Sequence, residues 1–564
     1  MNFLRYINEL VSYDPNSPMI FNSGIFLILF IFFIVIYALI HKNRLSVTLF
    51  VIAFSCLFYY KSSGWYLWIL VFTTFTDYGF AILISKTKRL LYKRVYLFLA
   101  VSVSMGILFY FKYTNFFLLN FHEIVGKNFQ PLDIFLPIGI SFYTFQSVSY
   151  VLDVYWKKLE PTKDILDYAF FLTYFPQLVA GPIVKANLFL PQLKKPITIK
   201  KEDVYSGLWL IMVGMFKKAI IADYISQYND LVFANPSQYS GFENLMAVYG
   251  YTLQIYCDFS GYSDMAIGLG KMMGWDLGIN FNFPYKATNI TDFWRRWHIS
   301  LSSWLRDYLY IPLGGNKKGK VRTYINLFIT MLLGGLWHGA SWKFVFWGAW
   351  HGIGLAIHKS TRSLLDKISN SWTSNAISWF VTFHFVIFLW IFFRANDLNH
   401  EVYKHVETIA PNKRTESFIN YDNGKNTLSV KVFQNDTLVN TFMQPLEVTS
   451  NDLRIKKEVE NGTETIVVNR VENAYHVAWT IIGNITTDID LAYAFPFLKV
   501  RYVWIILLLI GFAMHSTPVR WNEKVQNIFV KSPYVLKVFI FIVLVQMVIQ
   551  FKSEDVQPFI YFQF

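Results

Sequence analysis

The stretch that decides the fold runs from Ile20 to Ile40 and reads IFNSGIFLILFIFFIVIYALI. A helix needs about 20 apolar residues to cross the hydrocarbon core of a bilayer, and this run has that length. The rest of the chain agrees, since 54% of its 564 residues are hydrophobic and the mean hydropathy is +0.34. Charged residues make up 16% of the chain, against about 25% in soluble domains. The run is too long for a cleaved signal peptide, so we expect a membrane protein.

Similar apolar windows recur along the chain, and several of them are short or interrupted. They predict an all-α polytopic protein with about ten to twelve transmembrane helices, some of them re-entrant or interfacial. The further windows are 45–60, 65–85, 95–113, 135–152, 166–182, 204–223, 243–257, 324–337, 342–358, 376–394, 502–515 and 534–551.

Basic loops predict the orientation. The segments HKNR (41–44) and KTKRLLYKR (86–94) are separated by two expected spans, and the positive-inside rule places both in the cytoplasm with the N-terminus outside. The loop GGNKKGKVRTY (314–324) is expected on the same side. Basic loops that face an anionic inner leaflet account for the net charge of +14. We therefore do not expect nucleic-acid binding. The only cysteines, Cys56 and Cys257, lie in apolar segments, which excludes a disulfide framework or a cysteine metal site.

Residues 400–499 differ from the rest. They contain 10 Lys and Arg against 13 Asp and Glu, and stretches such as TLSVKVFQND and ETIVVNRV alternate as β-strands do. We therefore expect a membrane core at 1–399, a soluble, β-like, extracytoplasmic insert at 400–499, and C-terminal transmembrane helices at 500–564 that complete the core.

The stretch LLGGLWHGASWKFVFWGAWHG (332–352) places His338 in an apolar run. Ionisable residues inside a membrane usually face a bundle interior or a cavity, and an imidazole can take a proton from a hydroxyl. Small neighbours at Gly334, Gly335 and Gly339 would let a substrate or another backbone approach. The structural alternative is a core histidine bonded to a neighbouring helix. His351 lies about 220° further round a helix, so a two-histidine metal site is not expected, and a structural role is favoured there.

A second stretch, DFWRRWHISLSSWLRDYLYIPLGG (292–315), carries many charges among aromatic residues. It predicts an interfacial or re-entrant helix, either lining a cavity or anchored at the lipid headgroups by Trp and Arg. The anchoring alternative explains the arginines well but explains His298 less well, because a histidine adds little anchoring.

Two further segments interrupt apolar runs. In YCDFSGYSDMAIGLGKMMG (256–274), Asp258 and Asp264 border an expected glycine-rich apolar turn. FPQLVAGPIVKANLFLPQL (175–193) contains Pro176, Gly181 and Pro182, which would break a span beside a cavity. The glycine spacing does not match a dinucleotide fingerprint, and no phosphate-binding loop, zinc spacing or nucleophile elbow is present in the sequence.

In this order, the four segments 175–193, 256–274, 292–315 and 332–352 resemble the membrane-bound O-acyltransferase (MBOAT) superfamily, most closely its alginate O-acetylation (AlgI-like) branch. The final PFIYFQF resembles the same branch. The resemblance covers about residues 15–395 and 500–564, and it does not cover the long polar insert.

The resemblance implies a ring of membrane helices around a thinned centre, with His338 as the catalytic base and His298 as the second polar residue of the site. It implies an O-acyltransferase of the bacterial inner membrane that acetylates a cell-surface polysaccharide through an extracytoplasmic partner protein. We expect no metal or other cofactor, and the acyl donor would be acetyl-CoA or another thioester. Further candidates for substrate or donor binding are Trp337, Gly335, Arg295, Arg296, Asp292, Lys317 and Lys318.

Three other functions stay open from the sequence. One is transfer of D-alanine from a carrier protein to teichoic acid by a sister enzyme with the same histidines. The others are a transporter, which would show inverted repeats and paired charges in its spans, and a non-catalytic scaffold for polymer export, in which His338→Ala would be silent.

Overall fold

A computed structural model describes residues 12–14, 18–125, 131–179, 181–365, 371–408, 413–422, 425–434, 437–446, 453–460 and 463–551. The PFIYFQF segment at 558–564 lies outside these residues. The chain divides into two compact units. The first contains residues 1–228, 249–390 and 498–564, and the second contains residues 229–248 and 391–497.

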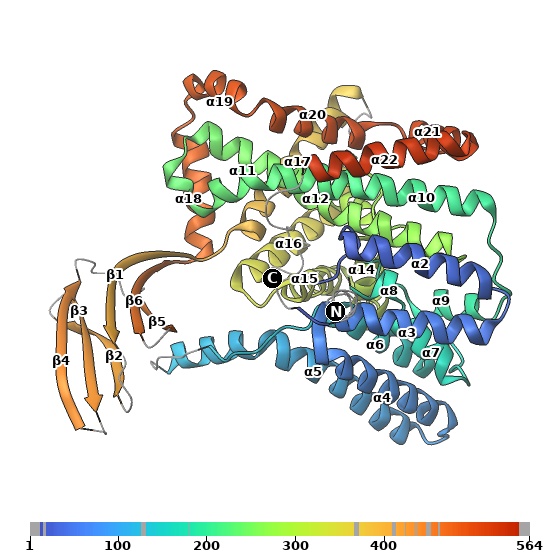
Figure 1. Cartoon of the computed structure of the whole chain (residues 1–564), viewed down its shortest axis with the longest axis horizontal. Coiled ribbons are helices and arrows are strands. Elements are labelled where there is room, and N and C mark those ends of the chain that lie inside the picture. The colour runs from blue at the N-terminus through green and yellow to red at the C-terminus, as the bar shows by residue number, and fades with distance from the viewer. Residues whose placement is uncertain are drawn as a thin grey trace, which may run out of the picture. The chain divides into compact units, whose positions relative to one another are not determined.

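The first unit is helical, and Figure 1 gives the order of its elements along the chain. Its first half contains α2 (Gly24–Ile40), α3 (Arg44–Ser63), α4 (Leu67–Lys86), α5 (Leu90–Ile124), α6 (Ile140–Tyr155), α7 (Ile165–Thr173), α8 (Phe175–Leu178), α9 (Ala186–Leu193) and α10 (Lys201–Met215). After the π-helical segment η2 (Phe216–Ala222) come α11 (Asp223–Ala234), α12 (Gly241–Met272), α13 (Ile290–Arg296), α14 (Ile299–Leu305), η5 (Arg306–Tyr310), α15 (Lys320–His338), α16 (Trp342–Leu365) and α17 (Trp372–Arg394). The chain closes with α20 (Tyr502–Ser516), α21 (Val519–Lys531) and α22 (Tyr534–Phe551).

Within the described residues, five helical segments are long and apolar enough to cross a membrane, and a bent pair at 491–516 would make six. The expectation of ten to twelve spans exceeds this number. One reason is that several apolar windows form short helices. Even the stretch Ile20–Ile40 begins its helix only at Gly24, where Ser23 caps it, and the 17 residues of α2 span about 26 Å. The five segments are 44–86, 90–124, 201–234, 372–394 and 534–551.

Other windows form short, broken helices inside the unit. Gly139, with φ of +78°, starts α6, and almost every residue of α6 is buried, including Gln146 and Asp153. The span expected at 166–182 is split between α7 and α8 at Tyr174. A Cβ atom at Gly181 would lie 2.4 Å from the carbonyl oxygen of Pro176, so this turn requires glycine. The proline and glycine residues therefore break the span, as the sequence predicts.

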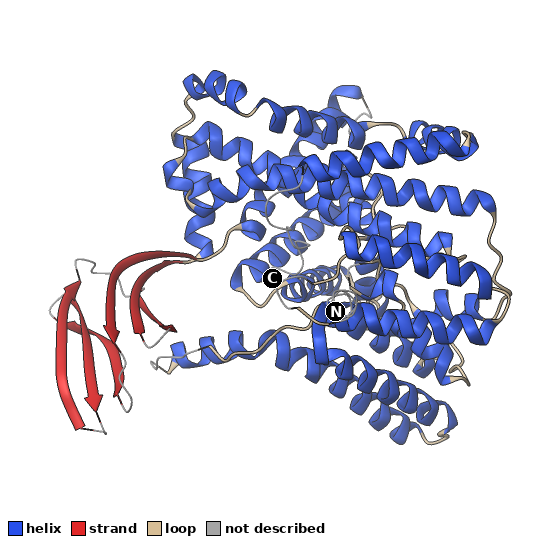
Figure 2. Cartoon of the chain, in the orientation of Figure 1, coloured by secondary structure: helices blue, strands red, loops and turns tan. Residues whose placement is uncertain are grey.

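The second unit contains every strand that the structure describes, and Figure 2 shows them gathered in two sheets. One sheet has the order β1 (Leu398–Thr408), β6 (Thr463–Glu472), β5 (Leu453–Glu460), and the other has β2 (Lys413–Asp422), β3 (Lys425–Gln434), β4 (Thr437–Leu446). All neighbouring strands are antiparallel. Alternate residues of β3 and β6 point the same way. This alternation builds an apolar core of Leu428, Val430, Leu446, Ile466 and Val468.

The β-like character expected of residues 400–499 ends at Glu472, and the rest of that segment is helical. Asn473 caps α18 (Ala474–Thr487), and α19 (Ala494–Val500) follows. The buried residues of α18 recur at the spacing of one helical face, which overrides the strand prediction for this part. They are Ala474, Val477, Ala478 and Ile481.

Candidate active site

His298 lies in the tight turn between α13 and α14, and its side chain is completely buried. Its φ of +43° is unusual for a residue with a Cβ atom and costs about 1–3 kcal/mol, so the surrounding structure must hold it. The ring of Phe259 in α12 packs against its imidazole edge to face, with the ring centres 4.6 Å apart. The segment 292–315 is therefore a broken, partly buried helix rather than one that only rests at the headgroups.

Asn280 is the polar partner of this turn. Its Oδ1 lies 3.2 Å from Nδ1 of His298 and accepts hydrogen bonds from the hydroxyl (2.9 Å) and backbone amide (3.2 Å) of Ser300. Its own backbone carbonyl accepts from the amide of Ile299 at 2.9 Å, and its Nδ2 donates to Oγ of Ser263 at 3.0 Å. These contacts hold both the backbone of the turn and the imidazole.

His338 is the last residue of α15 and is 2% exposed. The last carbonyl groups of a helix have no hydrogen-bond donors within that helix. In α15, side chains of helix α5 supply these donors. Lys112 donates to the carbonyls of Trp337 (2.7 Å) and His338 (2.9 Å), and the hydroxyl of Tyr113 donates to the carbonyl of Leu336 at 3.0 Å. Helix α5 thereby fixes the end of the helix that carries His338.

Trp337 packs near both histidines. Its ring centre is 6.1 Å from that of His298 and 5.1 Å from that of His338, and His338 also packs edge to face on Trp347 at 5.1 Å. Two histidines that are 40 positions apart in the sequence therefore share one buried site with Trp337.

The glycines beside His338 bring helices α15 and α16 together. A Cβ at Gly335 would lie 2.2 Å from the carbonyl oxygen of Phe344, and one at Gly339 would lie 2.1 Å from the ring of Phe344. A Cβ at Gly348 of α16 would in turn lie 3.0 Å from the Cα of Gly335. Of the two uses expected for these glycines, the structure shows the approach of another backbone at Gly335, whereas Cβ atoms at Gly334 and Gly339 would meet side chains.

The other charged candidates lie away from this buried pair. Arg296 pairs with Asp292 at 2.8 Å across one helical turn, while Arg295 is exposed. Lys317 and Lys318 are exposed residues of the turn before α15. The structure therefore brings together His298, His338 and Trp337, and it leaves these charged residues at the surface or half-buried.

A charged cluster surrounds Asp307 in η5. Lys185 donates to one of its carboxylate oxygens at 2.6 Å and Arg306 to the other at 2.7 Å. Burial alone would raise the pKa of Asp307, but the hydrogen bonds and charges of Arg306 and Lys185 outweigh burial and lower the pKa below its usual value. Asp307 is therefore ionised throughout the physiological range.

His351 and His358 have local structural partners. The indole of Trp294 donates to Nδ1 of the buried His351 at 3.3 Å, and Nδ1 of His358 lies 2.8 Å from the hydroxyl of Thr291. Both fit the structural role that the sequence favours for them. Across the described ranges of the chain, no group of three or more His, Cys, Asp or Glu side chains is arranged to hold a metal ion.

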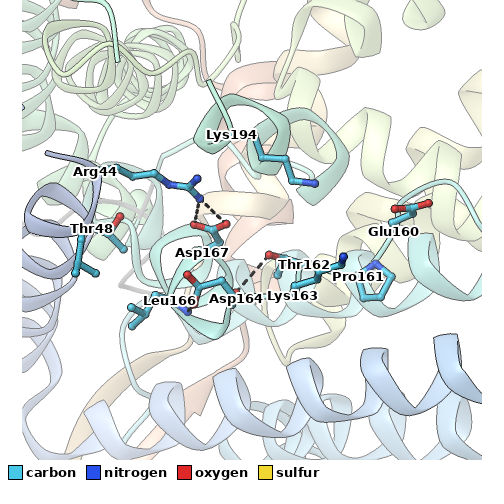
Figure 3. Close-up of a pocket in the computed structure, with 11 residues that line it drawn as sticks. Arg44, Thr48, Glu160, Pro161, Thr162, Lys163, Asp164, Leu166, Asp167 and Lys194 are labelled. Atoms are coloured by element: carbon cyan, nitrogen blue, oxygen red, sulfur yellow. Dashed lines mark hydrogen bonds and ion pairs between the residues drawn. The ribbon is translucent and has the colours of Figure 1, made fainter. Parts of the chain in front are cut away.

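A pocket of about 680 Å³ opens elsewhere in the first unit, between the start of α3 and the loop before α7 (Figure 3). Arg44 donates hydrogen bonds to both carboxylate oxygens of Asp167, at 2.6 and 2.7 Å. Asp164 caps α7 by accepting a hydrogen bond from the amide of Leu166. Acidic and basic groups are balanced in its lining, and neither histidine of the buried pair borders it. We therefore place the candidate active site at the histidines.

Sequence reasoning missed three residues of the site: Asn280, Lys112 and Tyr113. A signal was available for Lys112, because a lone lysine in the apolar stretch ILFYFKYTNFF (107–117) is costly unless it has a buried partner. Asn280 gave no such signal, since an asparagine between two helices is ordinary in a loop.

Comparison with known proteins adds a family. The family model described as "MBOAT, membrane-bound O-acyltransferase family" matches residues 160–395, which include both histidines and Asn280. The chain is 38% identical over 413 residues to the peptidoglycan O-acetyltransferase of Helicobacter pylori, covering 67% of this chain and 78% of that protein. A probable alginate O-acetylase of Pseudomonas putida is 41% identical over 390 residues (68% and 78%). A teichoic acid D-alanyltransferase of Bacillus subtilis is 30% identical over 285 residues (48% and 71%).

Proposed function

The chain belongs to the membrane-bound O-acyltransferase family, and from this premise we propose that it transfers an acetyl group to O-acetylate a cell-surface polysaccharide. It is a membrane-bound O-acyltransferase, and its two O-acetylating relatives are matched over about two thirds of the chain. The observation that carries the proposal is the buried pair His298 and His338, whose rings both lie near that of Trp337.

In the proposed reaction, His338 removes the proton of an acceptor hydroxyl, and the hydroxyl oxygen attacks the carbonyl carbon of a thioester. The new ester C–O bond forms, the C–S bond breaks, and the proton passes from His338 to the leaving thiolate, so no net charge builds up. His298 is the second polar group that contacts the substrate. Water is a competing acceptor, and burial of both histidines keeps it away from the thioester.

We further propose that the donor is acetyl-CoA or another thioester that arrives from the cytoplasm. The exposed Lys317 and Lys318, followed by Lys320 and Arg322 at the start of α15, would attract its phosphates. The proposed acceptor is a hydroxyl of an extracytoplasmic partner protein, which passes the acetyl group to the polymer. We propose that the protein lies in the bacterial inner membrane with its N-terminus outside.

Transfer of D-alanine to teichoic acid is the second candidate. The Bacillus subtilis relative named for that reaction is matched over 48% of this chain, against 67% for the peptidoglycan O-acetyltransferase. Because both reactions would use the same histidines, donor assays separate them. Membranes given radiolabelled acetyl-CoA or D-alanyl carrier protein would transfer label from one and not from the other.

The test is ester-linked acetate on purified surface polysaccharide from cells with wild type, His338→Ala or His298→Ala at matched membrane levels. We expect acetate to fall to background in His338→Ala, while His41→Ala, a histidine in the turn between α2 and α3, serves as the control and keeps it. Unchanged acetate in His338→Ala would overturn the proposal and favour a scaffold.

A further inference from the structure

Asn280 connects segments that are far apart in the sequence. Its Nδ2 reaches Ser263 in the segment 256–274, and its Oδ1 reaches the His298 turn in the segment 292–315. Through Ser300, whose hydroxyl accepts from the amide of Ile183 at 3.0 Å, it also joins the broken span at 175–193. The residue is 1% exposed, so these bonds form out of reach of solvent.

The hydrogen bonds decide which end of the Asn280 amide faces His298. A backbone N–H can only donate, and the N–H of Ser300 lies 3.2 Å from the same amide atom that faces the imidazole. That atom must therefore be the oxygen. The other amide atom, the NH₂, then donates to the hydroxyl of Ser263, which is consistent with the same orientation.

The orientation of Asn280 in turn fixes the proton on His298. An amide oxygen only accepts, so the imidazole nitrogen that faces it, Nδ1, must carry the hydrogen. A neutral imidazole has one N–H, and which nitrogen bears it is set by the hydrogen bond of the other. In neutral His298, Nε2 therefore presents a lone pair.

We propose that Asn280 is a positioning residue of the acyl transfer, and that it holds His298 as a hydrogen-bond acceptor toward the substrate through Nε2. This inference rests on the proposed function, because it needs His298 to contact the substrate. It names the tautomer, the residue that sets it and the kind of substrate group that His298 recognises, which is a hydrogen-bond donor other than the reacting hydroxyl.

The consequence concerns the role of His298. A group that orients the acyl carbonyl or stabilises the oxyanion must donate a hydrogen, and neutral His298 has no hydrogen on Nε2 to give. It instead receives a hydrogen bond from an N–H or O–H group of the substrate other than the reacting hydroxyl, whose single proton goes to His338. That bond orients the substrate while His338 takes the proton of the reacting hydroxyl. A substrate without such a second donor would gain nothing from His298.

The direct test is nitrogen NMR of the full-length protein labelled with ¹⁵N-histidine in lipid bilayers, at about pH 8, where an ordinary histidine is neutral. The His298 signals are identified by their loss in His298→Gln. We expect the Nδ1–H tautomer in the wild type and a shift toward Nε2–H in Asn280→Leu, which removes the oxygen. A wild-type His298 in the Nε2–H form would overturn the inference without any variant.

Activity provides the second readout. With the thioester donor and the hydroxyl acceptor varied separately, Asn280→Leu should lower kcat about 10- to 100-fold, as loss of a residue that orients a histidine ligand does at metal sites. Asn280→Asp keeps the oxygen and should retain the Nδ1–H tautomer. Asn289→Ala is the matched control, because Asn289 lies in the same connection and caps α13 through the amide of Asp292.

The two proposals fail in different ways. If His338→Ala keeps wild-type acetyl transfer, the proposed function fails. If His338→Ala is inactive while Asn280→Leu keeps both the Nδ1–H tautomer and wild-type kcat, only the role of Asn280 is wrong. If Asn280→Leu does not reach the membrane, Asn280→Asp and the wild-type tautomer still decide the inference, because neither needs the leucine variant.

Discussion

Lys112 is a charged side chain within an apolar helix, where burying a charge is energetically costly. Its hydrogen bonds at the end of α15, next to His338, offset this cost. Its ammonium group donates to the last two carbonyls of α15, where a cation is also favoured by the helix dipole. It lies 5.8 Å from the ring centre of Trp337, within cation–π distance. One residue of α5 thus supports both the backbone and the aromatic side chain that precede His338.

We predict that Lys112→Met destabilises the protein by about 1–3 kcal/mol, because it leaves buried carbonyls without donors. It should also lower acetyl transfer by about 100-fold, since a displacement of a catalytic group by about 1 Å can cost that much. Thermal unfolding in detergent and transfer assays on the same membranes measure the two effects.

The controls for Lys112 are its own conservative variant and its neighbour. Lys112→Arg keeps donors for the two carbonyls and should retain most of the activity. Tyr113→Phe removes one neutral hydrogen bond, to Leu336, and should cost about 0.5–1.5 kcal/mol. Full activity in Lys112→Met would show that α15 positions His338 without help from α5.

At the residue scale, the sequence predicts the two histidines of the candidate site. It does not predict the residues whose hydrogen bonds fix their positions. His338 and His298 stand out because ionisable groups are rare in apolar surroundings, and the resemblance assigns them the same importance. Asn280 acts through hydrogen bonds to residues 17 and 20 positions away, and such contacts depend on how the elements fold back on each other. A single sequence carries no signal for them.

Helices α15 and α16 are packed through glycines. A Cβ at Gly348 would lie 2.4 Å from the carbonyl oxygen of Met331, and one at Gly352 would lie 2.9 Å from the Cα of Phe328. Gly348 and Gly352, four residues apart on α16, therefore allow close helix packing. Because His338 ends α15 immediately before α16 begins, any separation of the two helices moves His338.

We predict that Gly348→Ala lowers both the unfolding temperature and acetyl transfer, because neighbouring backbone cannot move away from the added methyl group without separating the helices. Gly106→Ala in α5 is the matched control, since nothing lies within 4 Å of a Cβ there. Comparable unfolding temperatures for the two variants would contradict the packing argument. The comparison is best read from unfolding curves in one detergent.

A buried ion triad joins η2, α11 and α12. Lys218 lies 2.7 Å from the carboxylate of Asp223 and 2.5 Å from that of Asp258, and the lysine is 1% exposed. Asp258 thus has a structural partner. The glycine-rich turn that the sequence suggests beside it does not form, because α12 continues through that segment from Gly241 to Met272. Removing one member of such a cluster leaves uncompensated charge in a region of low dielectric constant.

We predict that Lys218→Met costs about 3–5 kcal/mol of stability, because two buried carboxylates lose their cation. The neighbouring Lys217→Met is the control, since the Lys217–Asp264 pair at 2.7 Å is partly exposed and should contribute less. Protein yield in membranes and resistance to heating report the difference. Equal losses in the two variants would mean that burial of the triad does not set its importance.

Most elements are predictable from the sequence, but their lengths and breaks are less so. Apolar windows correctly mark the helices, because the hydrocarbon core demands long apolar runs. They do not reveal that α6, with nine hydroxyl, amide or carboxylate side chains among its 16 residues, is buried inside the unit rather than exposed to lipid. The same windows therefore predict more spans than the structure supports.

At the scale of the whole molecule, the strands β1 to β6 form an insert with a narrow base. Leu398 at its start pairs with Glu472 at its end, so the entering and leaving chains are adjacent neighbours in one sheet. Asp397 accepts a hydrogen bond from the amide of Ala474 at 2.8 Å just below that pair. The family model ends at residue 395, before the insert begins.

Because the two ends of the insert are adjacent, the insert can be replaced by a short linker. Its role can then be tested in the otherwise intact protein. We predict that replacing residues 399–471 with a short glycine-serine linker leaves the helices folded, because Asp397 and Ala474 keep their hydrogen bond. If the insert recruits the extracytoplasmic partner, the variant should lose polysaccharide acetate while its membranes still bind the acetyl donor. Unchanged polymer acetylation would remove the insert from the transfer. Loss of both polymer acetate and donor binding, with normal membrane levels and unfolding temperature, would instead place the insert in the donor half of the reaction.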